Sequence, residues 1–225
     1  MWTTSEVTVL LPTLNEELSI VATISEINKV APGVKIVVVD GLSTDRTVEL
    51  ARQFENVSIT LVIDKGKGTA VRKALKWIDS KYVVMMDADF TYPAKYIPVL
   101  LRQLDNGYDV VLGYRRYRQA RAMSCVNVVG NWGLSFLSSI LYQKGVKDVC
   151  TGLWGFRRAS LERFRLTSLG FTLEADLWAN AVDSGCKIAQ IPIEYRARLS
   201  GSVTKLKVSH GLEIAWFLIK SRFRK

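Results

Sequence analysis

Short apolar runs rich in β-branched residues alternate with helix-like segments along the first half of the chain. Val7–Leu11, Lys35–Val39 and Tyr82–Met86 have the length and composition of buried strands. Between them lie segments whose apolar residues recur every three or four positions, as in an amphipathic helix. Strands that alternate with helices form a mostly parallel, doubly wound sheet. The alternation therefore predicts an α/β fold.

The expected elements can be given approximate bounds from pattern, turn residues and helix-breaking residues. Expected strands cover residues 7–11, 35–40, 58–63, 82–87 and 109–112, and expected helices cover residues 15–30, 44–54, 67–78 and 93–106. With 225 residues, 48% of them hydrophobic, the chain is long enough to bury the core of one such domain. We assign residues 1–205 to this domain and residues 206–225 to a basic, amphipathic C-terminal helix.

Charge and cysteine content narrow the class of protein. The chain has 31 Lys and Arg against 21 Asp and Glu, a formal charge of +10, which favours an anionic partner such as a nucleic acid, an anionic lipid or a phosphorylated substrate. Cys125, Cys150 and Cys186 lack metal-ligand spacing, so we interpret them as reduced core thiols of an intracellular protein. No signal peptide is expected at the start, and no apolar run reaches the roughly 20 residues of a membrane span.

Acidic residues stand where two of the expected strands end. Asp40 closes one strand, and Asp87 and Asp89 follow another, two residues apart, so that both are expected on one side of the chain. In an open α/β sheet, ligands bind beyond the carboxyl ends of the strands. Paired carboxylates there suit a hard divalent cation that also binds phosphate oxygens. The plainer alternative is that these acids are ordinary solvated turn residues.

Two apolar segments are bordered by clustered cations. Residues 126–142 include Trp132 and Phe136 and follow an arginine-rich stretch, and residues 206–225 include Trp216 between groups of Lys and Arg. One alternative is a pair of core helices with solvated charged ends. Because both segments combine Trp with cations, we favour amphipathic helices that lie in a membrane interface.

An ordered set of motifs resembles glycosyltransferase family 2, and within it the polyprenyl-phosphate sugar synthases, similar to the dolichyl-phosphate mannose and glucose synthases. The motifs of the first half are Leu11–Glu17, Val39–Thr47, Gly66–Gly68 and Asp87–Asp89. Those of the second half are Gly113–Arg115, Asp148, Thr151–Arg157, Gly170–Glu174, Ile191–Tyr195, Arg198, Gly201–Ser202 and Lys205–Leu206. The resemblance covers nearly the whole chain and implies a GT-A fold, which is a single Rossmann-like α/β domain.

The resemblance also implies roles in binding a nucleotide-sugar donor. By position, Pro12, Asn15, Glu16 and Asp40 would line the nucleoside pocket, with Asp40 holding the base. Lys67 would lie near the donor diphosphate, at the start of a helix. Without the resemblance, the segment around Lys67 would be described only as a basic turn.

The same resemblance makes Asp87 and Asp89 the ligands of Mg²⁺ or Mn²⁺ on the donor diphosphate. Two positions depart from the family pattern, and the first of them bears on metal geometry and donor identity. Thr91 stands where mannose synthases of this type often have Gln, and Gly41–Leu42 stands where many relatives have Asp-Gly.

Transfer to a lipid phosphate would require cations more than a general base, because the acceptor phosphate is already ionised near neutral pH. Arg115, Arg198 and Lys205 are the main candidates, with Asp89 as the other catalytic residue. Three further residues would position the acceptor or the sugar: Arg121, Glu174 and Ser202.

The sequence therefore predicts an inverting, metal-dependent hexosyltransferase that uses GDP-mannose, UDP-glucose or UDP-N-acetylglucosamine and a polyprenyl (dolichyl) phosphate. We expect it on the cytoplasmic side of a membrane, either docked peripherally or held by a small membrane subunit. One alternative is a family 2 enzyme that glycosylates a glycan or another hydroxyl acceptor. An alternative of another class is a basic nucleic-acid-binding module, although the chain lacks the motifs of one and we expect no nucleic-acid partner.

Overall fold

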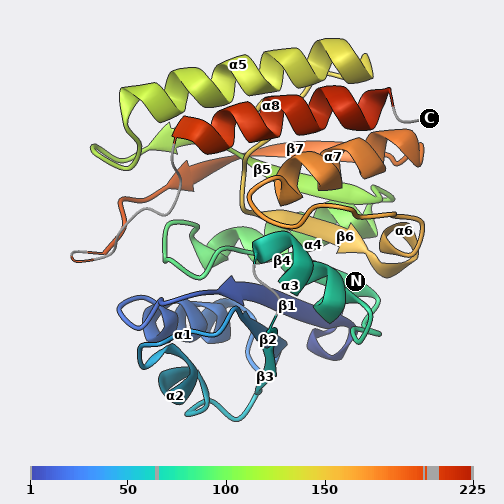
Figure 1. Cartoon of the computed structure of the whole chain (residues 1–225). Helices are drawn as coiled ribbons and strands as arrows, with labels where there is room; N and C mark the ends of the chain where they lie inside the picture. Colours follow the sequence, from blue (N-terminus) through green and yellow to red (C-terminus); the bar gives the residue numbers. More distant parts are fainter. Residues whose placement is uncertain (1, 64–65, 200, 202–207, 224–225) are drawn as a thin grey trace.

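The computed structural model describes residues 2–63, 66–199, 201 and 208–223, and within them seven strands form one sheet (Figure 1). The strands are β1 (Val7–Thr13), β2 (Lys35–Asp40), β3 (Val57–Leu61), β4 (Tyr82–Met85), β5 (Val110–Arg118), β6 (Trp154–Arg157) and β7 (Ile188–Tyr195). Their order is β3-β2-β1-β4-β6-β5-β7, and β6 runs antiparallel to both of its neighbours while the other pairs are parallel. The predicted α/β class with a mostly parallel sheet is confirmed.

Helices cover both faces of this sheet. The α-helices are α1 (Ile20–Val30), α2 (Thr47–Ala51), α3 (Lys67–Leu75), α4 (Ile97–Asp105), α5 (Cys125–Tyr142), α6 (Arg158–Leu161), α7 (Leu173–Asp183) and α8 (Val208–Arg222). Two short 3₁₀ helices, η1 (Thr4–Glu6) and η2 (Ala94–Tyr96), precede β1 and α4.

Alternation along the strands produces two separate cores, one on each face of the sheet. Leu10, Val37, Val39, Val83 and Met85 pack on one face with residues of α3, α7 and α8. Val9, Leu11, Ile36, Val38 and Val84 pack on the other face with residues of α1, α2 and α4. Trp154, Phe156 and Trp178, which the sequence assigns to the core, are buried as expected.

The C-terminal helix is part of this packing. α8 lies beside α5 and α7 (Figure 1), and its residues Ile214 and Leu218 are buried in the core. The hydroxyl of Tyr142 lies 2.6 Å from that of Ser221, and Arg222 donates to the carbonyl of Leu141. None of the helices in the described ranges is long and apolar enough to span a bilayer.

Several predicted bounds are wrong. The helix predicted from Asn15 starts at Ile20. Asn15 has a left-handed backbone (φ 51°), which excludes it from a helix, and residues 17–19 form a turn before the helix. The helix predicted from residue 44 starts at Thr47, after Asp45 accepts a hydrogen bond from the Thr47 amide. β4 ends at Met85, so the two acids that follow lie beyond the strand rather than on it. β6 and β7 are not among the strands bounded from sequence.

One cysteine differs from the prediction as well. Cys186 is buried and Cys150 is half-buried, but Cys125 is exposed at the start of α5, so it is not a core thiol. All three thiols are free.

Candidate active site

The topology brings the predicted site residues to one edge of the sheet. β1, β2, β4, β5 and β7 are oriented alike, so their carboxyl ends share this edge, and β6, which is antiparallel, begins there. β2 ends at Asp40, Asp87 follows β4, Arg115 lies on the distal half of β5, and Arg198 follows β7. Acids and cations that are far apart in the sequence thus converge, as expected for an open α/β sheet.

The loops after β1 and β2 are joined by side-chain hydrogen bonds. The Asn15 amide donates to the hydroxyl of Ser43 (2.8 Å), and the Asn15 side chain accepts from the Thr44 amide (2.8 Å). The Glu16 amide donates to the hydroxyl of Thr47 (2.7 Å). These bonds hold both loops in a fixed arrangement next to Pro12, which lies near the end of β1.

Asp40 is completely buried, and Ser43 donates hydrogen bonds to both of its carboxylate oxygens. The Ser43 amide donates to one oxygen at 2.8 Å, and the Ser43 hydroxyl donates to the other at 2.5 Å. Asp40 therefore shapes the turn in which Gly41–Leu42 replaces the Asp-Gly of the motif, and Leu42 takes a left-handed backbone (φ 66°). In this arrangement the carboxylate holds the turn after β2.

Asp87 forms an ion pair with Lys67. The Lys67 ammonium lies 2.5 Å from Asp87 and 2.6 Å from Glu174, so it bridges the acid after β4 and an acid in the first turn of α7. Burial alone would lower the pKa of Lys67, but the two carboxylates outweigh burial and raise it above its ordinary value. Gly152 leaves room for Asp87, because a Cβ there would collide with the Asp87 carboxylate.

Asp89 is paired with Arg198. The guanidinium lies 2.6 Å from one carboxylate oxygen, and the other oxygen accepts hydrogen bonds from the amide and the hydroxyl of Thr91. Burial and the like charge of Asp87 raise the pKa of Asp89 above its ordinary value, against the opposing effect of Arg198. Thr91, the residue that departs from the family pattern, thus orients the second acid of the pair.

Asp87 and Asp89 fit a hard divalent cation in ligand type, since carboxylate oxygens suit Mg²⁺ and Mn²⁺. Across the part of the chain that the structure describes, no group of three or more His, Cys, Asp or Glu residues could hold a metal ion. Two acids fit an ion that takes its remaining ligands from a bound diphosphate and water.

Arg115 lies in a buried pair with Asp148. Its Nε and one terminal nitrogen donate to the two oxygens of Asp148 at 2.7 and 2.6 Å, and both side chains are less than a tenth exposed. The guanidinium lies over the ring of Tyr195, 5.2 Å from its centroid, and that ring packs edge-on against Tyr92. The Tyr92 hydroxyl accepts from the Gly152 amide (2.6 Å), and Gly152 packs against Asp87. Arg115, Tyr195 and Tyr92 are thereby connected to Asp87.

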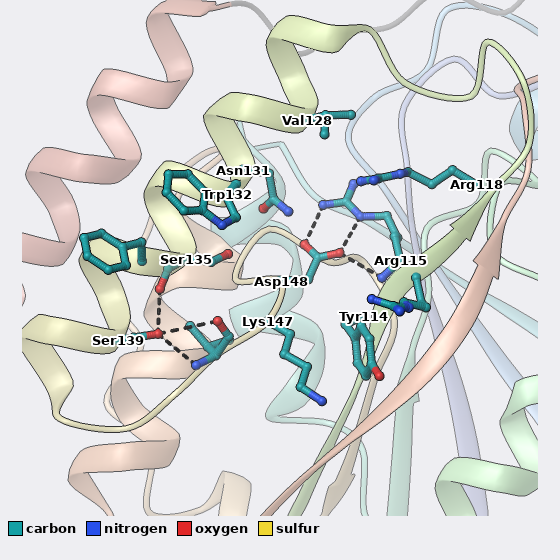
Figure 2. Close-up of a pocket in the computed structure, with 13 residues that line it drawn as sticks. Tyr114, Arg115, Arg118, Val128, Asn131, Trp132, Ser135, Ser139, Lys147 and Asp148 are labelled. Atoms are coloured by element: carbon teal, nitrogen blue, oxygen red, sulfur yellow. Dashed lines mark hydrogen bonds and ion pairs between the residues drawn. The ribbon is translucent and has the colours of Figure 1, made fainter.

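A cavity of about 460 Å³ opens between the distal half of β5 and α5 (Figure 2). The Arg115–Asp148 pair lies on its β5 side and Trp132 on its α5 side, as Figure 2 shows. Its other cations are Arg116, Arg118 and Lys147. Cations beside an aromatic helix face suit a ligand that has an anionic head and an apolar body.

The remaining predicted residues fall in different places. Arg121 is exposed, with a left-handed backbone (φ 64°), in the turn between β5 and α5. Glu174 forms an ion pair with Lys67. Ser202 and Lys205 lie outside the described residues.

Sequence reasoning missed several residues of the cavity and one residue, Tyr92, that connects it to Asp87. Arg116 and Arg118 were seen only as members of a basic run, although their place directly after the strand of Asp109–Leu112 was a usable signal. Lys147 and Tyr92 carry no local signal, because only the fold brings them to the site.

Comparison with known proteins agrees with this geometry. Residues 8–165 match the family described as Glycosyl transferase family 2. The chain is 35% identical over 198 residues to the dolichyl-phosphate hexose transferase of Haloferax volcanii, which covers 88% of this chain and 86% of that protein. It is 29% identical over 219 residues to the dolichol-phosphate mannosyltransferase of Pyrococcus furiosus, covering 90% of this chain and 59% of that longer protein.

Solved structures share the fold at lower identity. The glucosyl-3-phosphoglycerate synthase of Mycobacterium tuberculosis in complex with UDP superposes with a TM-score of 0.73 at 21% identity, over 97% of this chain and 79% of that one. Another structure of that enzyme, in complex with Mn²⁺ and UDP-glucose, also gives a TM-score of 0.73. At this identity the likeness shows the GT-A type of fold alone.

Proposed function

The chain belongs to glycosyltransferase family 2 and is a glycosyltransferase, and from that premise we propose that it transfers a hexose from a nucleotide sugar to a polyprenyl phosphate. The observation that carries the proposal is the cavity of cations and aromatic side chains between β5 and α5. Arg115 of this cavity is connected to Asp87 through Tyr195, Tyr92 and Gly152. The names of the two relatives, a hexose transferase and a mannosyltransferase of dolichyl phosphate, support the same acceptor.

On the donor side, the joined loops after β1 and β2 would hold the nucleoside, and Asp87 and Asp89 would hold Mg²⁺ or Mn²⁺. When bound, this ion would neutralise the charge that develops on the diphosphate as it leaves. Lys67 and Arg198 lie against the same two acids and would add positive charge around the diphosphate.

On the acceptor side, Arg116, Arg118 and Lys147 would hold the lipid phosphate in the cavity. A phosphate oxygen forms the new bond to the anomeric carbon from the face opposite the diphosphate, the bond from that carbon to the diphosphate oxygen breaks, and the nucleoside diphosphate leaves with the electron pair. Because the attacking phosphate is already ionised, this step needs orientation and charge stabilisation rather than proton removal. Configuration at the anomeric carbon is inverted.

The apolar body of the acceptor would approach along α5 and α8, from the cytoplasmic face of a membrane. α5 exposes a stripe at helical spacing, which consists of Val126, Val129, Trp132, Phe136 and Ile140, and α8 adds Leu212 and Trp216. Exposed apolar side chains on two neighbouring helices, with Lys220 and Arg222 close by, suit a helix pair lying in a lipid interface.

A donor screen tests the proposal. The protein is incubated with Mn²⁺, polyprenyl phosphate and, in turn, GDP-mannose, UDP-glucose and UDP-N-acetylglucosamine, each with a labelled sugar. We expect one donor to give a labelled lipid that mild acid hydrolyses, as a glycosyl phosphate should. A variant Asp89→Asn serves as the inactive control.

The acceptor is tested in the same assay by replacing polyprenyl phosphate with the unphosphorylated polyprenol. We expect no labelled lipid from the alcohol. Equal labelling of the alcohol, or transfer only to a soluble glycan, would instead identify an enzyme that uses a hydroxyl acceptor.

A further inference from the structure

Lys67 occupies the position between two carboxylates where the proposed function places the donor diphosphate and its divalent ion. Its ammonium contacts Asp87 and Glu174, which lie 20 and 107 residues away in the sequence. The Lys67 side chain is 22% exposed, and that of Glu174 is 12% exposed. A cation so enclosed by two acids is part of the site rather than a solvated surface charge.

The backbone fixes Lys67 in this position. Gly66 has a φ of 108°, and a Cβ on it would collide with the carbonyl of Leu169. The segment that carries Lys67 therefore packs backbone to backbone against the segment that leads into α7, where Glu174 lies in the first turn. The Lys67–Glu174 contact thus follows from how the starts of α3 and α7 pack together.

We propose that Lys67 is a positioning residue that exchanges partners: it neutralises Asp87 in the donor-free enzyme and transfers to the donor diphosphate, still held by Glu174, when the metal and nucleotide bind. This inference rests on the proposed function, because it takes Asp87 and Asp89 as the ligands of the divalent ion. It assigns to Glu174 the task of holding Lys67 through the exchange.

The charges explain why such an exchange would be needed. Asp87, Asp89 and Glu174 bring three carboxylates together, and Lys67 with Arg198 supplies two cations. Without Lys67, Asp87 would be left as a poorly solvated, unpaired anion in the empty enzyme. A divalent ion alone must compete with the ammonium for Asp87 and so binds weakly. A diphosphate gives the ammonium a new partner, so metal and nucleotide assist each other's binding.

The test is to measure Mn²⁺ binding to the wild type, Lys67→Met and Lys67→Gln, first with Mn²⁺ alone and then with saturating GDP or UDP. Lys67→Gln keeps a hydrogen-bond donor for the carboxylates and serves if the Met variant does not fold, which melting curves show. Lys76→Met, at the exposed C-terminal end of α3, removes the same charge away from the site and is the matched control.

We expect each Lys67 variant to bind Mn²⁺ alone at least about fivefold more tightly and to bind the nucleoside diphosphate at least about fivefold more weakly than the wild type. Lys76→Met should leave both affinities unchanged. Parallel weakening of both ligands would mean that Lys67 only supports the loops, and unchanged Mn²⁺ binding would mean that it does not compete with the ion; either result overturns the inference.

The metal site and the partner exchange of Lys67 can be refuted separately. If wild-type protein with GDP or UDP binds Mn²⁺ and Asp89→Asn abolishes that binding, the metal site at these acids is supported. Lys67 variants that do not show the expected changes in affinity then refute only the exchange. If the wild type with nucleotide binds no Mn²⁺ at these acids, the metal-dependent function fails, and the exchange is refuted with it.

Discussion

Each of the two acids in the Asp87–Asp89 pair is matched with its own cation, and each cation reaches the pair from a different element. Lys67 comes from the start of α3, and Arg198 comes from the segment after β7. This pairing lets two carboxylates stand near each other in a largely buried place, where their repulsion would otherwise oppose folding. If the two acids bind a metal as proposed, they would do so only as their cations find other partners.

Loss of the second acid should abolish activity without unfolding the protein. In Asp89→Asn the amide oxygen can still accept from Thr91, so the turn is kept, but the negative charge that binds a divalent ion is lost. We expect sugar transfer to fall on the order of 100-fold or more, with an unchanged far-UV circular dichroism spectrum. Chelation by EDTA should stop transfer by the wild type, and added Mn²⁺ should restore it. Substantial transfer in EDTA would contradict a role for the metal.

Loss of Arg115 should lower the free energy of unfolding, because Arg115 is part of a buried ion pair. Replacing it with Met leaves Asp148 buried and without its bidentate partner, which typically costs about 3–5 kcal/mol of unfolding free energy. Arg116→Met, at the exposed neighbouring position, should change that free energy by less than about 0.5 kcal/mol. Urea unfolding of the two variants measures the difference. Equal and small losses would show that the Arg115–Asp148 pair does not hold β5 to the segment before β6.

At the scale of elements, local pattern predicted five of the seven strands and the helices between them, but not the loops that make the site. β1 and β2 follow from their β-branched runs. The late start of α1 does not, because the loop before it is held by hydrogen bonds that Asn15 donates to Ser43 and accepts from Thr44, 28 and 29 residues away. β6 has only four residues, Trp154–Arg157, and one of them is a glycine, so it is too short to show a strand pattern.

For the site as well, the sequence predicted several of the residues but not their partners. Asp87, Asp89 and Arg198 were singled out from sequence, and the structure brings them to one edge of the sheet. Which cation meets which acid could not be predicted, since the Lys67–Glu174 contact joins residues 107 positions apart. Asp40 shows the same limit: its place at a strand end was foreseen, but its complete burial under Ser43 depends on how the following turn folds.

The exposed face of α8 should bind lipid through Trp216. Deleting α8 would be a poor test, because Ile214 and Leu218 belong to the core and their loss would uncover it. Trp216→Gln leaves the core intact, since this side chain is 65% exposed. Its removal should weaken binding to lipid vesicles about tenfold, as expected for one large apolar side chain.

Trp77→Gln is the matched control for this change. Trp77 is also exposed, at 81%, but it follows α3 and lies on neither α5 nor α8. Vesicle flotation of both variants, alongside GDP and UDP binding, separates membrane docking from donor binding. If the two Trp variants float equally with the wild type, α8 does not form the lipid surface.

At the scale of the whole molecule, the charged residues of the candidate site lie at one edge of the sheet, and α5 and α8 carry exposed apolar side chains. The chain has an excess of ten positive charges, and several cations line the cavity under α5, Arg116, Arg118 and Lys147 among them. The proposed lipid surface and the proposed phosphate site therefore share α5, so a protein docked through these helices would bring its cavity close to anionic headgroups.

This arrangement predicts that docking depends on both lipid charge and salt. Each Lys or Arg near an anionic membrane contributes about 1 kcal/mol, and salt weakens that attraction because the screening length falls from roughly 10 Å at 0.1 M to about 3 Å at 1 M. Binding to vesicles that contain an anionic phospholipid should therefore fall as NaCl is raised over this range. Binding to neutral vesicles should be weaker and nearly independent of salt, because Trp216 and the α5 stripe act there without help from charge. Equal binding to both kinds of vesicle at every salt concentration would mean that the positive charge serves the substrates rather than the membrane.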